Sequence, residues 1–569
     1  MKKLIPILMS FMLLAGCASA PAAENVTPPI TVEATNPLIN YEPLVAPDSA
    51  PLPFTSRYDS ETVITLSDEG ITVNGGGETA DVYTSRDITY YEDRDTYDSG
   101  NTYGEGTDAD KHSAEEAAAH TVVNITAPGA YRVSGQLSAG QIRIDLGGSA
   151  YDDPNAVVEL ILDGADITCT VAPAILFRNV YECDGDWDAD NASSEVDTSA
   201  AGAVLVLEGE NTVNGSYVAK IFKDNDKEKK LWKQDGAIYS YMSMNVEGTG
   251  SLELNAENEG LDTELHLTIN GGNINICSGN DGINTNEDGV SVTTINGGCL
   301  NIVAGMGQEG DGIDSNGYLV INGGIVVSAA HPASDAGLDS DLGSYINGGT
   351  VVALGSTMDW AESESQQVTM NLQFASYQAG GTSIAVTRPD GTVIFAYTPE
   401  YARQYQGAII SCGNFQVGES YQVYTGSTIT GSEISGVYDV TTVTGQTGGN
   451  LMQYTGTDVS RFPGGFGDQH PGGQMPEGFD PSQMPENFKG EMPNMPQSEW
   501  NSEGFQGKPG DRETPQRGQM PENFDGQMPE GFDPSQFGDM FGGMTDGAPS
   551  TEFYMSDMVN SFSGVATVA

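Results

Sequence analysis

The sequence predicts an all-β protein in which short strands wind into a solenoid of repeated coils. Four copies of an Asn-Gly-Gly motif between apolar residues place asparagines at Asn270, Asn296, Asn322 and Asn347, which are 26, 26 and 25 residues apart. A period this short leaves no room for two packed helices, and the repeats lack helical apolar spacing. Glycine supplies 72 of 569 residues and apolar residues 38%, which favours a turn-rich chain over a helical bundle.

The elements follow in order along the chain. Residues 1–16 are typical of a signal peptide, and residues 17–119 are polar and acidic, which predicts an N-terminal spacer without a fold of its own. Short alternating apolar runs from 120 to 365 predict the solenoid. Residues 366–448 contain further short strands that would form a small β region capping it. Residues 449–569 are rich in Gly, Pro, Met and Gln and predict a disordered tail.

Equivalent positions of the repeats are expected to stack coil on coil. One apolar column would be formed by Ile269, Ile295, Ile321 and Ile346, and a second by Ile274, Leu300, Val326 and Val351. The Asn-Gly-Gly step would form the corner of each coil, because glycine adopts backbone conformations that other residues resist. The asparagines would then form an amide ladder along the stack.

The charge of the chain excludes one class of partner. Lys and Arg number 22 against 80 Asp and Glu, so the formal net charge is −58. Binding to nucleic acid depends on neutralising phosphates with basic residues, so we expect no nucleic-acid partner.

The N-terminus carries a targeting signal. A short apolar run after Lys2 and Lys3 ends in Leu14-Ala15-Gly16-Cys17, which closely resembles the lipobox of bacterial lipoproteins. The resemblance implies that Cys17 is lipidated and becomes the first residue of the mature protein. More than one acyl chain would anchor it stably, on the extracytoplasmic face of the cell membrane.

A recurring Asp-Gly-Ile step predicts a cation site. It appears, with variations, as Glu259-Gly260-Leu261-Asp262, Asp281-Gly282-Ile283-Asn284, Asp311-Gly312-Ile313-Asp314 and Ala336-Gly337-Leu338-Asp339. Stacked strands lie about 4.8 Å apart, so stacked carboxylates would repel one another unless a cation lay between them. Calcium prefers such oxygen ligands, and a solvated acidic ridge is the alternative. The candidate calcium ligands are Asp262, Asp281, Asp311, Asp314, Asp335 and Asp339.

A second acidic segment is similar to a calcium-binding EF-hand loop in its ligand spacing. It departs from that pattern at Ala189, where the loop needs glycine, and no helices are expected beside it. A loop calcium site and an acidic surface insertion both remain open. The candidate ligands here are Asp184, Asp186, Asp188, Asp190 and Glu195.

Aromatic residues in the coils are candidates for stacking on sugar rings. Of these we single out Trp232, Tyr239 and Tyr241, although packing in the core or in turns is the alternative for each. Between Gln234 and Thr387 the sequence contains no Lys or Arg. This counts against a polysaccharide lyase, which needs a basic residue near the sugar.

Several stretches between about 120 and 445 resemble one family. They are Gly129–Gly135, Gly140–Asp145, Leu160–Ile167, Asp235–Ser240 and the Asn-Gly-Gly and Asp-Gly-Ile coils. Together they resemble bacterial cell-surface carbohydrate-binding domain proteins with a pectate-lyase-like, right-handed parallel β-helix. The resemblance implies calcium in the helix and binding to cellulose-like or acidic, polygalacturonate-like polymers without established cleavage. The Asp184–Glu195 and Lys220–Lys233 insertions depart from the family pattern.

Three functions therefore remain. The preferred one is a lipid-anchored, calcium-loaded protein that binds polysaccharide, is monomeric and is not an enzyme. The second is a lyase or hydrolase of uronate polymers. The third is a structural adhesin without sugar affinity.

Overall fold

The computed structural model describes residues 54–91, 110–185, 188–221, 232–307, 309–356, 358–457 and 549–568. The predicted signal peptide and Cys17 lie outside these residues. The described chain is all-β, with two large sheets whose strands pair mostly in parallel. Its α-helix, α1 (Ala114–Ala119), begins at a capping box of Ser113 and Glu116. No helix among the described residues is long and apolar enough to cross a membrane.

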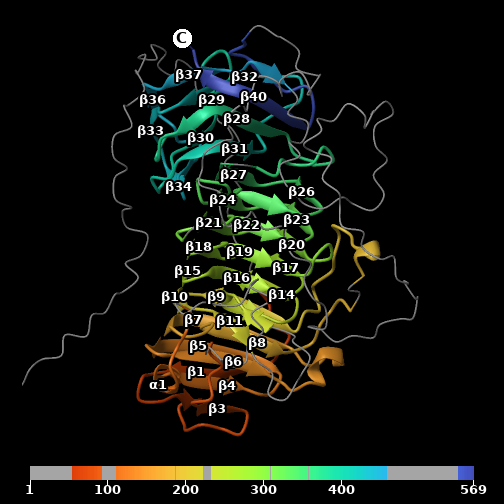
Figure 1. The fold of residues 1–569 in the computed structure, drawn as a ribbon, viewed down its shortest axis with the longest axis vertical. Coiled ribbons are helices and arrows are strands. Elements are labelled where there is room, and N and C mark those ends of the chain that lie inside the picture. Colours follow the sequence, from red (N-terminus) through yellow and green to blue (C-terminus); the bar gives the residue numbers. More distant parts are fainter. Residues whose placement is uncertain are drawn as a thin grey trace, which may run out of the picture.

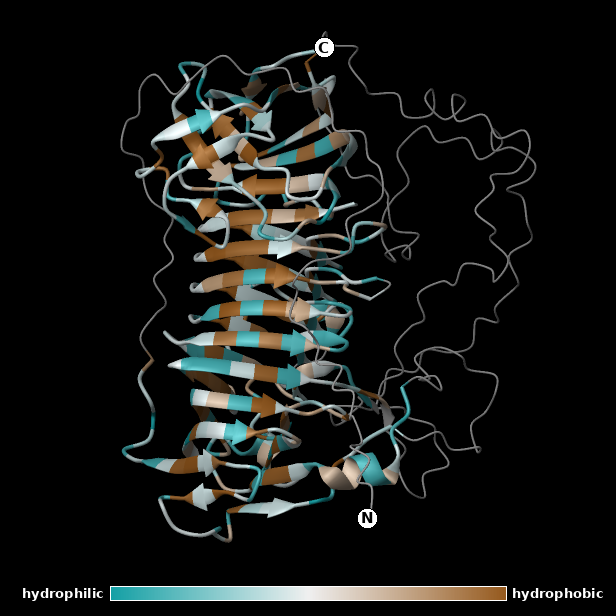
Figure 2. Cartoon of the chain, turned by 90° about the vertical axis from the view of Figure 1, so that its left-hand side faces the viewer, coloured by the Kyte–Doolittle hydropathy of each residue, from teal (hydrophilic) through white to brown (hydrophobic). Residues whose placement is uncertain are grey.

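Three rows of strands run along the molecule, each strand lying above its counterpart one repeat earlier (Figures 1 and 2). The first row contains β1 (Glu61–Leu66), β5 (Gly129–Leu137), β7 (Val158–Thr168), β9 (Ala203–Glu208), β14 (Met244–Gly248), β17 (Leu267–Ile269), β20 (Val292–Ile295), β23 (Tyr318–Ile321) and β26 (Gly343–Ile346). The second row continues from the ends of β5 and β7 through β10 (Glu210–Gly215), β15 (Ser251–Ala256), β18 (Asn273–Ser278), β21 (Cys299–Val303), β24 (Ile325–Ala329) and β27 (Thr350–Gly355).

The third row is a separate sheet of nine strands. From the C-terminal end it runs through β25 (Leu338–Ser340), β22 (Ile313–Ser315), β19 (Ile283–Thr285), β16 (Glu259–Thr263), β13 (Gly236–Ser240), β8 (Ile175–Asn179), β6 (Gly140–Asp145), β4 (Thr121–Ile125) and β3 (Val82–Ser85). Every pair is parallel except β3 with β4. The short antiparallel hairpin of β11 (Val218–Ile221) and β12 (Trp232–Gln234) precedes β13.

The predicted apolar columns form the core. Ile269, Ile295, Ile321 and Ile346 are successive partners in the register of the first row, and each is 0% exposed. The second column stacks in the same way in the second row. Because parallel pairing places equivalent residues above one another, one apolar residue per coil builds a continuous core.

The predicted amide ladder is also present. The side-chain Nδ2 of Asn296 donates to Oδ1 of Asn270 at 2.8 Å, and the Asn322 and Asn347 amides continue the series at 2.9 and 3.0 Å. Glycine is required at the corner. Gly324 has φ +81°, and a Cβ there would lie 2.6 Å from the Gly298 carbonyl oxygen of the preceding coil.

A cap of mostly antiparallel strands covers the C-terminal end of the stack (Figure 1). β31 (Tyr405–Ser411) pairs antiparallel with both β27 and β28 (Thr369–Gln378). The outward side chains of the second row explain why the cap packs against this end of the stack. Its outward column is polar in early coils at Glu253 and Asn275, but becomes Val327 and Val352, which are buried in the cap's core.

The other cap strands are β29 (Ile384–Thr387), β30 (Val393–Tyr397), β32 (Ser420–Thr425), β37 (Asn450–Gln453), β38 (Gly456–Thr457), β39 (Phe553–Tyr554) and β40 (Val559–Thr567), with the short β33 (Thr428–Thr430), β34 (Glu433–Ile434), β35 (Val437–Tyr438) and β36 (Gly445–Thr447) at their edge.

The structure corrects the predictions for both ends of the chain. Part of the predicted spacer, β1, pairs in parallel with β5 and buries Ile64 and Leu66 against the first coil. The end of the predicted disordered tail, β40, pairs with β28 inside the cap. Both strands have alternating burial, so each satisfies an open sheet edge and covers an apolar face. Residues 458–548 of the tail lie outside the described residues.

The burial of β40 leads to a test of this correction. Phe562 is 2% exposed, and its ring lies 5.0 Å from that of Phe553, whereas Tyr554 is 52% exposed. We expect Phe562→Ala to lower the free energy of unfolding of the cap by about 3–5 kcal/mol, measured by denaturant unfolding. Tyr554→Ala is the matched control and should change it little. Equal, small effects of both variants would contradict the packing of β40.

Candidate functional site

Two parallel columns of polar side chains run along the third row. The strand column consists of Asp262, Asn284, Asp314 and Asp339, which are successive partners in the register of β16, β19, β22 and β25. The turn column consists of Glu259, Asp281 and Asp311, just before the buried Leu261, Ile283 and Ile313. The structure thus brings five of the six candidate calcium ligands together along the third row, and the sixth, Asp335, lies beside them.

The turn column is tied together by backbone hydrogen bonds. The Asp311 amide donates to Oδ1 of Asp281 at 2.7 Å, and the Ala336 amide donates to Oδ1 of Asp311 at 2.6 Å. The Gly310 amide donates to Oδ2 of Asp335 at 3.2 Å. Asp281 and Asp311 therefore each use an oxygen to hold the next coil, and Asp335 uses one to hold the preceding coil.

The strand column contains unsatisfied oxygens. Asp262 is 0% exposed, and its Oδ1 accepts from Nδ2 of Asn286 at 2.6 Å. Among the described residues, no hydrogen-bond donor meets Oδ2 of Asp262 or Oδ1 of its register partner Asn284, and the Glu259 carboxyl lies close enough to that of Asp262 to share a proton with it. Buried polar atoms without a partner are rare and call for an explanation such as a bound ion.

Burial and like charge dominate the electrostatics of both columns. Desolvation raises the pKa of Asp262 well above its ordinary value, and Asp235 and Glu264 raise it further. Desolvation likewise raises the pKa of Asp281, with Asp314 and Glu259 adding to it, and that of Asp311, with Asp339 and Asp281 adding to it. A bound proton or a cation would therefore stabilise these carboxyls.

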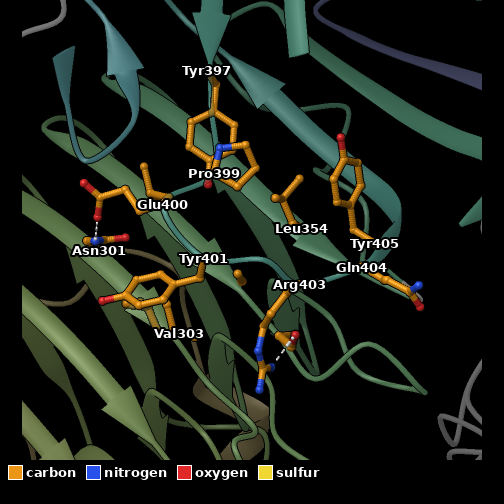
Figure 3. Close-up of a pocket in the computed structure, with 14 residues that line it drawn as sticks. Asn301, Val303, Leu354, Tyr397, Pro399, Glu400, Tyr401, Arg403, Gln404 and Tyr405 are labelled. Atoms are coloured by element: carbon orange, nitrogen blue, oxygen red, sulfur yellow. Dashed lines mark hydrogen bonds between the residues drawn. The ribbon is translucent and has the colours of Figure 1, made fainter. Parts of the chain in front are cut away.

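Two basic side chains reach this edge from outside the central coils. Nζ of Lys233 lies 2.7 Å from Oδ2 of Asp235, and the lysine side chain is 51% exposed. Arg403, in the loop between β30 and β31, donates to the carbonyl oxygens of Ala304, Ala330 and Gly305, the last at 2.7 Å. Figure 3 shows this arginine and one of its hydrogen bonds. The same loop places Glu400 2.9 Å from Nδ2 of Asn301.

The columns fit calcium in chemistry but not as a complete cage. Their donors are carboxylate and amide oxygens, the ligands that calcium prefers. Within the described ranges, however, no group of three or more His, Cys, Asp or Glu side chains is placed to hold a metal ion. An ion here would need further oxygens from water or from a bound molecule.

A protein-family model shows to which family the chain belongs. The model described as "Carbohydrate-binding domain-containing protein" matches residues 119–184 and 188–420, more than half of the chain. The chain belongs to this family.

Two known proteins are similar to this carbohydrate-binding domain protein. One, a carbohydrate-binding domain-containing protein of Acetivibrio thermocellus, is 30% identical over 155 residues, which are 27% of this chain and 44% of the relative. The match thus spans less than half the relative's length. The other is a solved structure of a polysaccharide lyase-like protein from C. thermocellum, a gadolinium derivative. It is 21% identical with a TM-score of 0.30, and covers 50% of this chain and 91% of its own.

The EF-hand-like segment of this family member does not form a metal-holding group among its described residues. Asp186 lies outside them. Oδ2 of Asp184 lies 3.4 Å from Nε2 of His266, and Oδ1 of Asp188 caps a short 3-10 turn by accepting from the Asp190 amide. The Glu195 amide bonds to the Ser193 hydroxyl. The segment from 188 to 195 is therefore held by its own turns.

The structure buries both tyrosines that the sequence suggested for sugar stacking. Tyr239 is 1% exposed and Tyr241 8%, their rings pack edge to face at 5.1 Å, and the Tyr239 hydroxyl donates to Glu264. Buried in this way, the two rings support packing in the core, the alternative considered for them, and not stacking on a sugar. The side chain of Trp232 lies outside the described residues.

Sequence reasoning missed Asp235, Lys233 and Arg403. Asp235 had a signal, since Asp235-Gly236-Ala237-Ile238 repeats the Asp-Gly step one coil before Glu259. No sequence pattern marked Lys233 or Arg403, because the β11–β12 hairpin and the cap bring them near the third row only on folding.

The buried Asp262 predicts an unusual pH dependence of stability. Its pKa is raised in the folded state, so its contribution to stability is fully present below the ordinary carboxyl pKa and is lost as the pH rises through the raised value. Asp262→Asn imitates the protonated acid. In EDTA we expect this variant to be more stable than the parent near pH 8, by about 1 kcal/mol or more, and equally stable near pH 4.

Thermal unfolding at several pH values in EDTA measures this difference. Asp59→Asn, at an exposed position remote from the columns in sequence, controls for loss of one charge. Parallel pH profiles for the parent and Asp262→Asn would show that Asp262 does not titrate in the folded state as described.

Proposed function

We propose that this family member is a polysaccharide-binding protein of the cell surface, built as a right-handed parallel β-helix and anchored through lipidated Cys17. Calcium would be its cofactor, and the acidic columns of the third row its calcium site. The protein would act as a monomer and would bind without cleaving. The three rows of stacked parallel strands support the β-helix, and membership of the carbohydrate-binding family supports the polysaccharide ligand.

The observation that carries the calcium proposal is the pair of buried, unpartnered oxygens on neighbouring strands. Oδ2 of Asp262 and Oδ1 of Asn284 lie in a register that continues to Asp314 and Asp339. A divalent ion would satisfy these oxygens and offset the repulsion between stacked carboxylates.

The same ion would explain how so acidic a chain holds an acidic glycan. A net charge of −58 repels a polyuronate, so an ion is needed between the two. Among the described residues no group of three or more acidic or histidine side chains is placed to hold a metal ion, so sugar carboxylates or water would have to supply further ligands. In this proposal, calcium ions along the columns, each held by one or two of Asp281, Asp311, Asp314 and Asp339, bridge the protein to a polygalacturonate-like chain.

Lyase activity is the second candidate, since the fold brings Lys233 and Arg403 to the acidic edge. Neither is well suited to remove a proton from a sugar. Asp235 raises the pKa of Lys233, which keeps its ammonium protonated. The guanidinium of Arg403 is committed to three backbone carbonyls. Binding without elimination is therefore the favoured activity.

Paired substitutions test the calcium bridge. We expect Asp311→Asn with Asp314→Asn to weaken calcium-dependent binding of polygalacturonate by about tenfold or more, because two carboxylates leave the site while its shape is kept. Isothermal titration of the full chain with polygalacturonate, in calcium and in EDTA, measures this. The pair Asp59→Asn with Glu69→Gln removes the same charge at exposed positions near the N-terminal end of the stack and should bind normally.

The ultraviolet absorbance of unsaturated uronate product, recorded in the same titrations, separates binding from cleavage. A flat absorbance is expected. Rising absorbance would establish a lyase, and unchanged calcium-dependent binding by the Asp311 and Asp314 variant would reject this site.

A further inference from the structure

The turns that join the second row to the third row lengthen along the stack. Between β15 and β16, β18 and β19, β21 and β22, and β24 and β25 they consist of residues 257–258, 279–282, 304–312 and 330–337. The two longest turns carry Asp311 and Asp335. A long turn has more backbone groups outside the strand ladders, so its shape depends more on contacts from other parts of the chain.

The two long turns are bonded to each other and to the turn before them. The His331 amide donates to the carbonyl oxygen of Gly310 at 2.9 Å, and the Gly310 amide donates to Oδ2 of Asp335 at 3.2 Å. Gly305 has φ +61°, and a Cβ there would collide with Cβ of His331. The Gly305 amide also donates to the carbonyl oxygen of Asn280 at 2.8 Å. The carboxylates of these turns therefore depend on one another for their positions.

One arginine of the cap holds both long turns. Arg403 belongs to the loop between β30 and β31, which lies against the second row (Figure 3). Its guanidinium donates to the carbonyl oxygens of Ala304 and Gly305, where the first long turn begins, the latter at 2.7 Å. It also donates to the carbonyl oxygen of Ala330, where the second begins, at 2.9 Å. One side chain thus joins the starts of two turns that lead into the acidic columns.

Arginine suits this position better than lysine does. A guanidinium presents five N–H donors in a planar fork, so it can reach carbonyls of neighbouring coils in fixed directions, whereas an ammonium is a point charge on a flexible stem. Burial lowers the pKa of Arg403, and the nearby Asp335 opposes this effect. A cation that gives up part of its hydration needs hydrogen bonds in exchange, and the turn carbonyls provide them.

We propose that Arg403 is a positioning residue for the acidic columns. By holding the two long turns together, it fixes the spacing of the carboxylates of Asp281, Asp311 and Asp335, and so the site for a cation. The cap and the columns are then coupled, because a cation that fixes these turns also favours the docked loop. The inference deepens the proposed calcium function and rests on it for the ligand, but the effect of Arg403 on the turns requires no bound ion.

The direction of the change in calcium affinity tests this proposal. By charge alone, Arg403→Gln would strengthen calcium binding, because a cation leaves the neighbourhood of Asp335. Positioning predicts the opposite: a calcium affinity weakened by about tenfold or more in Arg403→Gln, and weakened also in Arg403→Lys, which keeps the charge but not the fork. Isothermal titration of the full chain with calcium chloride, without glycan, measures this. Arg388→Gln removes the same charge from a half-buried arginine between β29 and β30 and should bind calcium like the parent.

Hydrogen exchange in EDTA separates this proposal from the calcium proposal. Peptides covering 304–312 and 330–337 should exchange faster in both Arg403 variants than in the parent, whereas peptides covering β6 should not change. Arg403→Lys, the milder change, keeps the test open if Arg403→Gln does not fold. A parent protein that binds no calcium would reject the calcium proposal, and exchange alone would then decide the role of Arg403. Folded variants with unchanged exchange in the two turns, or with calcium binding as tight as the parent's or tighter, would overturn the positioning role.

Discussion

Parallel pairing between coils is the constraint on which the rest of the structure depends. Each strand of the three rows hydrogen-bonds to its counterpart one repeat away, so a residue type that recurs in the repeat must contact its own copies. This arrangement favours isoleucine, whose copies fill the core, and asparagine, whose amide both donates and accepts. For carboxylates it is unfavourable, since neighbouring copies lie about one strand spacing apart.

The acidic columns show how the chain tolerates that arrangement. In the turn column, Asp281 and Asp311 each accept a hydrogen bond from the backbone of the next coil, which compensates for part of the cost of burial. In the strand column, Asn284 separates Asp262 from Asp314 and so interrupts the series of like charges. Desolvation by burial, together with the remaining repulsion, raises the pKa values of Glu259, Asp262, Asp281 and Asp311. A column built in this way holds its carboxyls in place whether a proton or a cation neutralises them.

The repeat determined which features could be predicted from sequence. The isoleucine columns and the Asn270–Asn347 ladder were predictable because their period is visible in the chain, and the same period placed Asp281 and Asp311 together. β1 and β40 were missed because each is a single strand without a repeat, and its partner is remote in sequence: Thr369 pairs with Val559. Burial of Tyr239 depends on what covers the outward side of β13, which no local pattern reveals.

The outward sides of the rows differ because covering elements are added to a regular stack. Val327 and Val352 make the second row apolar where the cap packs, so that side is used for stability. The third row presents carboxyl oxygens, and the first row presents rings and amides between β20 and β26. All three surfaces extend along the direction of stacking, in which the chemistry repeats once per coil. A polymer is the ligand best matched to such an array, because each added sugar can repeat the contacts of the one before, whereas a small molecule would use only one coil.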